Sequence, residues 1–361
     1  MKILRVAGVL FLCGIAPGFG QANDAAFFRI SSPSNAVIAG FDPLAGTLAC
    51  SNTVAGTTNQ LQRTYDLVGT SNWVNFVQLV SNTSVITETI IDLDPPEGMA
   101  FIPGGSFQMG DSFGEDYSNE QPVHSVYVSP FYMGKYEVTK ALWDEIHSWA
   151  TSHGYIFDHE GFGKADSHPV HTVNWYDCVK WCNARSEMEG RTPCYNISDW
   201  SCDFSANGYR LPTEAEWEKA ARGGLNGKRF EWGDLIAHGN ANYYGSSNYV
   251  YDVSSTQKYH PAYNDGVKPY TNPEGSFAPN AYGLYDMAGN IREWCWDWYE
   301  GSYYETSPWS NPRGASTGLS RIERGGGWNS YARDCRLVRR AAVTPSFATN
   351  NKGFRVVLPT N

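Results

Sequence analysis

A single cysteine among arginines is the feature of this sequence with the clearest chemical potential. Cys335 lies within five positions of four arginines, which are Arg333, Arg336, Arg339 and Arg340. Nearby cations favour a thiolate over a thiol, so an exposed Cys335 would be a candidate nucleophile or metal ligand. The alternative is a buried structural thiol, beside arginines that pair with carboxylates inside the domain.

Three consecutive glycines, Gly325 to Gly327, precede this cysteine, and the segment closes at Gly353. Residues without a Cβ adopt positive φ readily and leave room for a neighbouring chain. We therefore expect the backbone of the glycine run to approach another segment closely.

Three amphipathic segments are predicted to be helices that position this stretch. The first follows Thr139, a candidate N-cap, and places Leu142, Trp143, Ile146 and Trp149 on one face. The second covers residues 175–188, between Asn174 and Gly190.

The third predicted helix has the clearest boundaries. Thr213 and Glu216 have the spacing of a capping box, and Gly223 is placed to end the helix. Before these helices, residues 99–110 are predicted to form a hairpin. Residues 232–280 show no periodicity, and loops of this length in a compact domain are usually functional or stabilised by an ion.

The amino-terminal residues predict export. Residues 1–22 combine a basic start, an apolar run and small residues, which is typical of a secretory signal peptide. Residues 23–91 predict a small β-rich module, and 92–98 a linker. The net charge of −10 argues against nucleic-acid partners. No later stretch is apolar enough to span a bilayer.

Seven cysteines remain beyond the predicted signal peptide, an odd number that leaves at least one thiol without an intramolecular partner. Cys194 and Cys202 flank a polar loop and are predicted to form a local disulfide. Cys178 and Cys182 are four positions apart on a predicted helix and are interpreted as packing residues. The others are Cys50, Cys295 and Cys335.

Several motifs, in this order, resemble the formylglycine-generating enzyme (sulfatase-modifying factor) family. They are residues 102–110, 120–124, 209–218, 282–294, 324–328 and 353–355. The resemblance covers residues 99–358. It implies an α+β class with the irregular formylglycine-generating-enzyme fold, related to the C-type lectin fold and here preceded by the β-rich module.

The resemblance also implies an activity and two metals. Active members oxidise a sulfatase cysteine to formylglycine with copper held by two cysteines, whose positions here are Ser330 and Cys335. A serine hydroxyl does not replace a soft thiolate on Cu(I), so Ser330 argues against this chemistry. Ca²⁺ is implied at two oxygen sets. The first set is Asn242, Tyr243, Asp265 and Val267, and the second set is Asp286, Gly289, Ile291 and Glu293.

Three functional hypotheses follow from these residues. The first is an exported sulfatase-modifying oxidase, with a sulfatase as its partner. The second is a non-catalytic module that binds a polypeptide or glycan through Trp328, Asn329, Tyr331 and Arg333. The third is a different oxidase that uses Cys335 alone.

Overall fold

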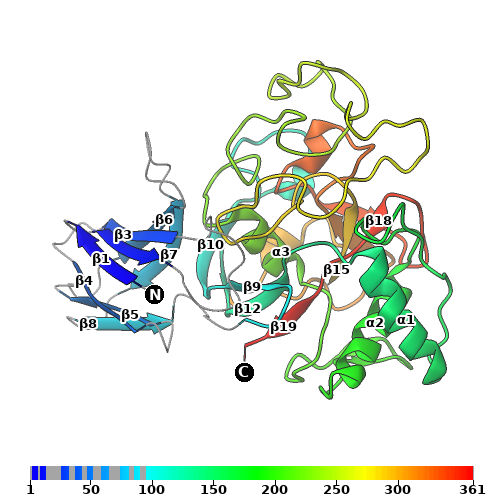
Figure 1. Ribbon diagram of the computed structural model, residues 1–361, viewed down its shortest axis with the longest axis horizontal. Coiled ribbons are helices and arrows are strands. Elements are labelled where there is room, and N and C mark those ends of the chain that lie inside the picture. Colours follow the sequence, from blue (N-terminus) through cyan, green and yellow to red (C-terminus); the bar gives the residue numbers. More distant parts are fainter. Residues whose placement is uncertain are drawn as a thin grey trace.

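The computed structural model describes residues 95–360 in full and, before them, the backbone of eight strands (Figure 1). These strands form one antiparallel sheet in the order β1-β2-β3-β6-β7 and another in the order β4-β5-β8. Their bounds are β1 (Lys2–Val6), β2 (Val9–Cys13), β3 (Ala26–Ser31), β4 (Val37–Asp42), β5 (Thr47–Ser51), β6 (Thr58–Thr64), β7 (Val74–Val80) and β8 (Val85–Thr89). The signal peptide and the predicted domain boundaries stay predictions, and Cys50 lies among residues whose side chains are not described.

Helices and short strands alternate irregularly through residues 95–360, as expected for the predicted α+β class. The helices are α1 (Lys140–Ser152), α2 (Trp175–Met188), α3 (Glu214–Arg222) and the one-turn α4 (Tyr303–Thr306), with 3₁₀ turns η1 (Ser118–Glu120) and η2 (Ala332–Cys335). The strands are β9 (Met99–Ile102), β10 (Gly105–Met109), β11 (His124–Val128), β12 (Phe131–Gly134), β13 (Tyr195–Asn196), β14 (Ser201–Cys202), β15 (Arg292–Trp298), β16 (Arg321–Arg324), β17 (Ala341–Val343), β18 (Lys352–Gly353) and β19 (Val357–Pro359).

The strands of residues 95–360 pair into small sheets in the orders β10-β11, β19-β12-β9, β13-β14 and β17-β16-β15-β18. The predicted hairpin over residues 99–110 is therefore wrong, because β9 pairs with β12 and β10 pairs with β11. Gly104 separates the two strands, and a Cβ there would lie 2.8 Å from the ring of Pro130. Gly104 thus lies closely packed at the point where the chain passes from one sheet to the other.

The three predicted helices are confirmed, with their caps. Thr139 accepts a hydrogen bond from the Leu142 amide at the start of α1, and Asn174 caps α2. In α3 the Thr213 hydroxyl accepts from the Glu216 amide, and the Glu216 carboxylate accepts in return from the Thr213 amide. Gly223 ends α3 in the left-handed region at φ 54°.

The core of residues 95–360 contains three apolar clusters. In the first cluster, apolar side chains of the four strands β9, β10, β11 and β12 pack against those of α3. A second joins α1 to α2, where the rings of Trp143 and Trp181 lie nearly parallel, with centroids 6.3 Å apart. The third lies beneath the long loops and contains Phe230, Tyr243 and Cys335.

Residues 223–291 run between α3 and β15 without a helix or strand, and this stretch is described throughout. Figure 1 shows these loops as a layer that lies away from α1 and α2. Within residues 95–360 no helix is both long enough and apolar enough to cross a bilayer.

Candidate functional site

The glycine run packs against the loop that leads into β15, as its composition predicts. Gly325 and Gly326 have φ of 84° and 73°. The Gly325 carbonyl accepts a hydrogen bond from the Gly289 amide at 2.9 Å. A Cβ on Gly326 would lie 2.7 Å from the sulfur of Cys335. The glycine run therefore lies in close contact with both the loop at Gly289 and the thiol of Cys335.

Cys335 is fully buried at the end of η2, in the apolar cluster beneath the long loops. Burial is the largest influence on its thiol and raises the pKa well above the usual value, while the Asp334 charge raises it further. The Arg292 charge lowers the pKa only in part. Cys335 is therefore a protonated, packed thiol in this structure.

The neighbouring arginines are engaged with carboxylates rather than with the thiol. Arg336 lies 2.9 Å from a carboxylate oxygen of Glu120, and Arg340 lies 2.7 Å from one of Glu214. Arg339 pairs with Asp334 at 3.1 Å. Arg333 makes the longest of these pairs, 4.0 Å from a carboxylate oxygen of Asp334, and its side chain is 39% exposed.

We expect Cys335 to resist alkylation in the folded protein. A buried thiol with a raised pKa offers little thiolate and no access, so its reaction with iodoacetamide at pH 8 should be slower than that of unfolded protein by at least about tenfold. Mass spectrometry of tryptic peptides after timed alkylation, with and without urea, measures both rates. Partly exposed Cys202 serves as the internal comparison. Equal rates for folded and unfolded Cys335 would contradict the packed position.

Ser330 is held by two donors at the position of the missing cysteine. Its hydroxyl oxygen lies 3.0 Å from the Gly327 amide and 2.8 Å from the Arg292 guanidinium, and both groups donate to it. A guanidinium at this oxygen repels a metal cation, and a hydroxyl is a poor ligand for Cu(I). The residues at Ser330 and Cys335 therefore do not fit a two-thiolate copper site.

The predicted ligand surface is partly wrong, because Trp328 is buried. Its exposed fraction is 2%, and its indole N–H donates to the Asn350 carbonyl. The tryptophan packs against Tyr259 and Tyr270, which shield it from solvent. Asn329 is exposed, and Tyr331 is 40% exposed.

Half-buried tyrosines surround Tyr331 and Arg333. Tyr331 contacts Tyr244 and Tyr249, with ring centroids 5.3 and 5.9 Å away. The Arg333 guanidinium lies over the rings of Tyr249 and Tyr117. We call these five residues, from three segments of the chain, the Tyr331 surface.

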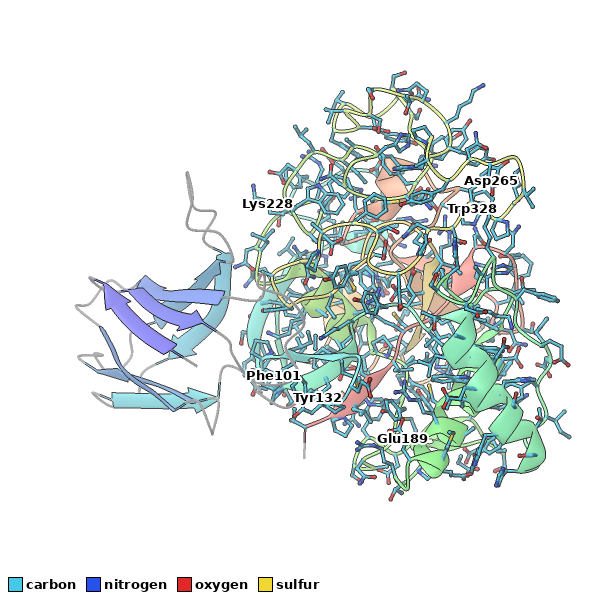
Figure 2. The ribbon with its side chains drawn as sticks, in the orientation of Figure 1. Phe101, Tyr132, Glu189, Lys228, Asp265 and Trp328 are labelled. Atoms are coloured by element: carbon cyan, nitrogen blue, oxygen red, sulfur yellow. The ribbon has the colours of Figure 1, made fainter. Side chains whose placement is uncertain are left out.

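The oxygens of the first set are engaged with groups of the protein, with one exception. Asn242 is buried, its amide donates to the Tyr270 carbonyl, and its Oδ1 has no hydrogen-bond donor. The Tyr243 carbonyl is contacted by His238 at 3.2 Å. Asp265 lies at the margin of the loop layer (Figure 2), where its carboxylate pairs with Lys164. The Val267 carbonyl accepts from the same lysine.

The second oxygen set lies in a buried, acidic environment. Asp286 and Glu293 are 5% and 0% exposed. Burial raises the pKa of Asp286 to about 6, although a hydrogen bond from Asn272 and the Arg355 charge oppose the shift. Glu293 accepts from Arg355 and, at 2.7 Å, from the indole of Trp217.

Two further carboxylates reach this region and were missed from the sequence. Glu137 accepts from the Asn290 side chain and the Ile291 amide. Glu231 is buried, and its Oε2 has no donor. Burial raises the pKa of both, and the Asp286 charge raises them further. A lone acid between Phe230 and Trp232 is the sequence signal that could have identified Glu231.

The orphaned Glu231 oxygen and the excess of buried carboxylates fit a cation on the Asp286 side of the second set, because both oxygens of Glu293 already accept from Arg355. Four carboxylates, those of Glu137, Glu231, Asp286 and Glu293, influence one another here, with Arg355 as the opposing charge. Within residues 95–360 no three His, Cys, Asp or Glu side chains converge as a metal site, so a cation here would also need the carbonyls of Gly289 and Ile291.

The predicted disulfide between Cys194 and Cys202 is wrong, because both thiols are free. Tyr195 pairs with Cys202 across β13 and β14. Cys202 is therefore opposite Tyr195 in the strand pair, and Cys194 is not its cross-strand partner. The Cys194 thiol instead donates to the Gly208 carbonyl.

Comparisons with known proteins agree with this fold. The model of the sulfatase-modifying factor enzyme 1-like domain matches residues 91–359. A formylglycine-generating enzyme of Streptomyces coelicolor is 36% identical and aligns with 72% of this chain and 88% of that protein. The chaperone protein LppX of Paenibacillus barcinonensis is 30% identical, with 72% of this chain and 89% of that protein aligned.

A solved structure shows the same fold. Treponema denticola variable protein 1 is 29% identical, has a TM-score of 0.55, and aligns over 73% of this chain and 95% of that chain. The similarity therefore extends over most of both chains in each comparison. This chain belongs to the formylglycine-generating enzyme (sulfatase-modifying factor) family.

Proposed function

We propose that this protein is an exported, non-catalytic member of the family that binds a polypeptide through the Tyr331 surface. The observation that carries the proposal is the Ser330 hydroxyl, which accepts from the Gly327 amide and the Arg292 guanidinium where a copper thiolate would be needed. The relatives support a role other than catalysis, since a protein named as a chaperone is 30% identical to this chain and the formylglycine-generating enzyme of Streptomyces coelicolor is 36% identical.

The surface itself favours a polypeptide over a glycan. Tyrosine and arginine provide large contact areas and are enriched where proteins bind one another. Tyr331 and Arg333 are accessible, and Tyr244 and Tyr249 support the Tyr331 ring. Asp286 and Glu293 are buried, so a calcium ion held by them could not coordinate sugar hydroxyls at the surface.

Export is supported by residues 1–22, whose basic start and apolar run are typical of a signal peptide. A sulfatase chain is then one class of polypeptide that the surface would meet outside the cytoplasm. Oxidation of a sulfatase cysteine is not part of the proposal.

The test compares the natural protein with Ser330→Cys. Both are reduced, titrated with Cu(I), and incubated with oxygen and a peptide that contains the Cys-x-Pro-x-Arg motif. We expect the natural protein to bind no copper stoichiometrically and to leave the peptide cysteine unchanged by mass spectrometry. Ser330→Cys should gain copper binding, and Ser330→Ala should not. Oxidation of the peptide cysteine to formylglycine by the natural protein would overturn the proposal. Stoichiometric copper binding by the natural protein would favour an oxidase that uses Cys335 alone.

Binding is tested separately with a fluorescent form of the same peptide. Tyr331→Ala should weaken its binding by about tenfold or more, because an exposed aromatic side chain at the centre of a contact typically contributes over 1 kcal/mol. Tyr127→Ala, at a stacked tyrosine outside this surface, is the control. Glycan array binding that depends on Tyr331, without peptide binding, would replace the polypeptide with a glycan.

We further propose that the second oxygen set binds calcium. Ca²⁺ at 100 times its dissociation constant would then stabilise the domain by about 2.7 kcal/mol, and a chelator would reverse the gain. Asp286→Ala should remove this response, while Asn272 keeps its hydrogen bond to the Pro273 carbonyl. Differential scanning calorimetry with calcium and with EDTA measures the shift. An equal shift in Asp286→Ala would show that calcium binds elsewhere.

A further inference from the structure

The ammonium group of Lys164 lies among oxygens of the first oxygen set. Its Nζ is 2.6 Å from a carboxylate oxygen of Asp265 and donates to the Val267 carbonyl at 3.1 Å. It also donates to the Pro269 carbonyl at 3.2 Å. An ammonium group has three N–H donors, so these three oxygens satisfy it completely.

The loop that carries Lys164 is fixed against residues 265–274 by further contacts. His168 shares a hydrogen bond with the Thr271 hydroxyl, and the Glu274 amide donates to the Ser167 carbonyl. The Lys164 side chain is only 21% exposed, and its Nζ lies 5.7 Å from the centre of the Tyr270 ring. The lysine is thus held in place by the chain on both sides of it.

The remaining oxygens of the first set do not offer a competing calcium cage. Asp265 uses its other carboxylate oxygen to accept from the Val267 amide. The Tyr243 carbonyl is contacted by His238, and Asn242 Oδ1 alone is left without a donor. Ca²⁺ needs six to eight oxygens, and a positive charge among its ligands repels it. The first set therefore does not fit calcium while Lys164 occupies it.

We propose that Lys164 is a tethered cation that replaces calcium at the first oxygen set, so that the order of this loop does not require the ion. The lysine supplies the positive charge that the Asp265 carboxylate and the two carbonyls need. A calcium ion becomes able to bind there only when the ammonium is removed. This proposal does not depend on the function proposed for the Tyr331 surface.

The experiment removes the ammonium in a protein whose second oxygen set is already disabled. Terbium, a luminescent substitute for calcium, is titrated into Asp286→Ala and into Asp286→Ala with Lys164→Met. Tyrosine-sensitised emission reports an ion near Tyr270. We expect no saturable emission from the single variant and one bound ion per chain in the double variant. Adding Asp265→Asn to the double variant should abolish its saturable emission. A double variant with Lys228→Met in place of Lys164→Met should show no saturable emission.

Lys228 is a matched control because it pairs with Asp234 at 2.6 Å, on a surface away from Asp265 (Figure 2). Saturable emission from Asp286→Ala that Asp265→Asn removes would overturn the proposal, since an ion would then bind beside Lys164. A folded Lys164→Met variant that gains no ion would overturn it as well. Circular dichroism establishes that each variant is folded. The calcium response of the natural protein tests the second set, so the two proposals fail separately.

Discussion

Arg355→Met should destabilise the domain by about 3–5 kcal/mol, because it leaves the buried Glu293 carboxylate without its counter-charge. Arg355 donates to both carboxylate oxygens of Glu293, and neither side chain is exposed. It also donates to the carbonyls of Gly134, Lys135 and Tyr285. The substitution therefore leaves the Glu293 charge with only the Trp217 indole as a donor, and each of the three carbonyls loses the hydrogen bond that Arg355 donates.

Urea unfolding followed by tryptophan fluorescence measures this loss. The control is Lys228→Met, which breaks a partly exposed pair with Asp234 and should change stability by no more than about 1 kcal/mol. A second variant, Arg355→Met with Glu293→Gln, removes both charges and should recover part of the loss. A loss for Arg355→Met no greater than for Lys228→Met would show that Glu293 does not depend on this arginine.

The free energy of unfolding of Asp297→Asn, relative to that of the natural protein, should increase by about 1.4 kcal/mol for each pH unit between pH 5 and 7. Burial, and then the Glu214 charge, raise the pKa of Asp297 to about 8. In this pH range the folded chain keeps a proton that the unfolded chain has released. The stability that this proton provides is complete below pH 4 and declines as the pH rises towards 8.

An asparagine at position 297 does not titrate and can still accept the hydrogen bond that the Glu214 amide donates to Asp297 at 2.7 Å. Urea unfolding of both proteins at pH 5, 6 and 7 gives the difference at each pH. Asp203→Asn is the control, because Asp203 is exposed and its pKa is lowered by Ser205, so its difference should be flat over this range. A flat difference for Asp297→Asn would mean that Asp297 is ionised in the folded protein.

The helices were predictable from the sequence because their signals are local. The capping box of Thr213 and Glu216 lies within three residues, and Gly223 adopts the left-handed conformation that only glycine takes readily. The three glycines before Trp328 were likewise correctly interpreted as a close approach of backbones. In both cases the residue types alone were sufficient to predict the local structure.

The site was less predictable, because its contacts join residues far apart in the chain. Trp328 resembled an exposed ligand residue, and only the fold places Tyr259 and Tyr270 over its ring. Lys164 lies about a hundred positions before Asp265, in a loop without any pattern that pairs the two. The free state of Cys194 depends on the register of a two-residue strand pair, which spacing in the sequence does not determine.

The pairing of β19 with β12 has a consequence for the synthesis of this protein. Phe131 to Met133 of β12 lie between β9 and β19. One edge of β12 therefore has no hydrogen-bonding partner until β19, the last strand of the domain, has been synthesised. Residues 135–356 take roughly 10–45 s to leave a ribosome that adds about 5–20 residues per second. During that time the nascent chain exposes an unpaired strand edge and lacks Arg355 opposite Glu293. The domain therefore cannot complete its fold until its last strand has been synthesised. Late folding is compatible with the export that we propose for this chain.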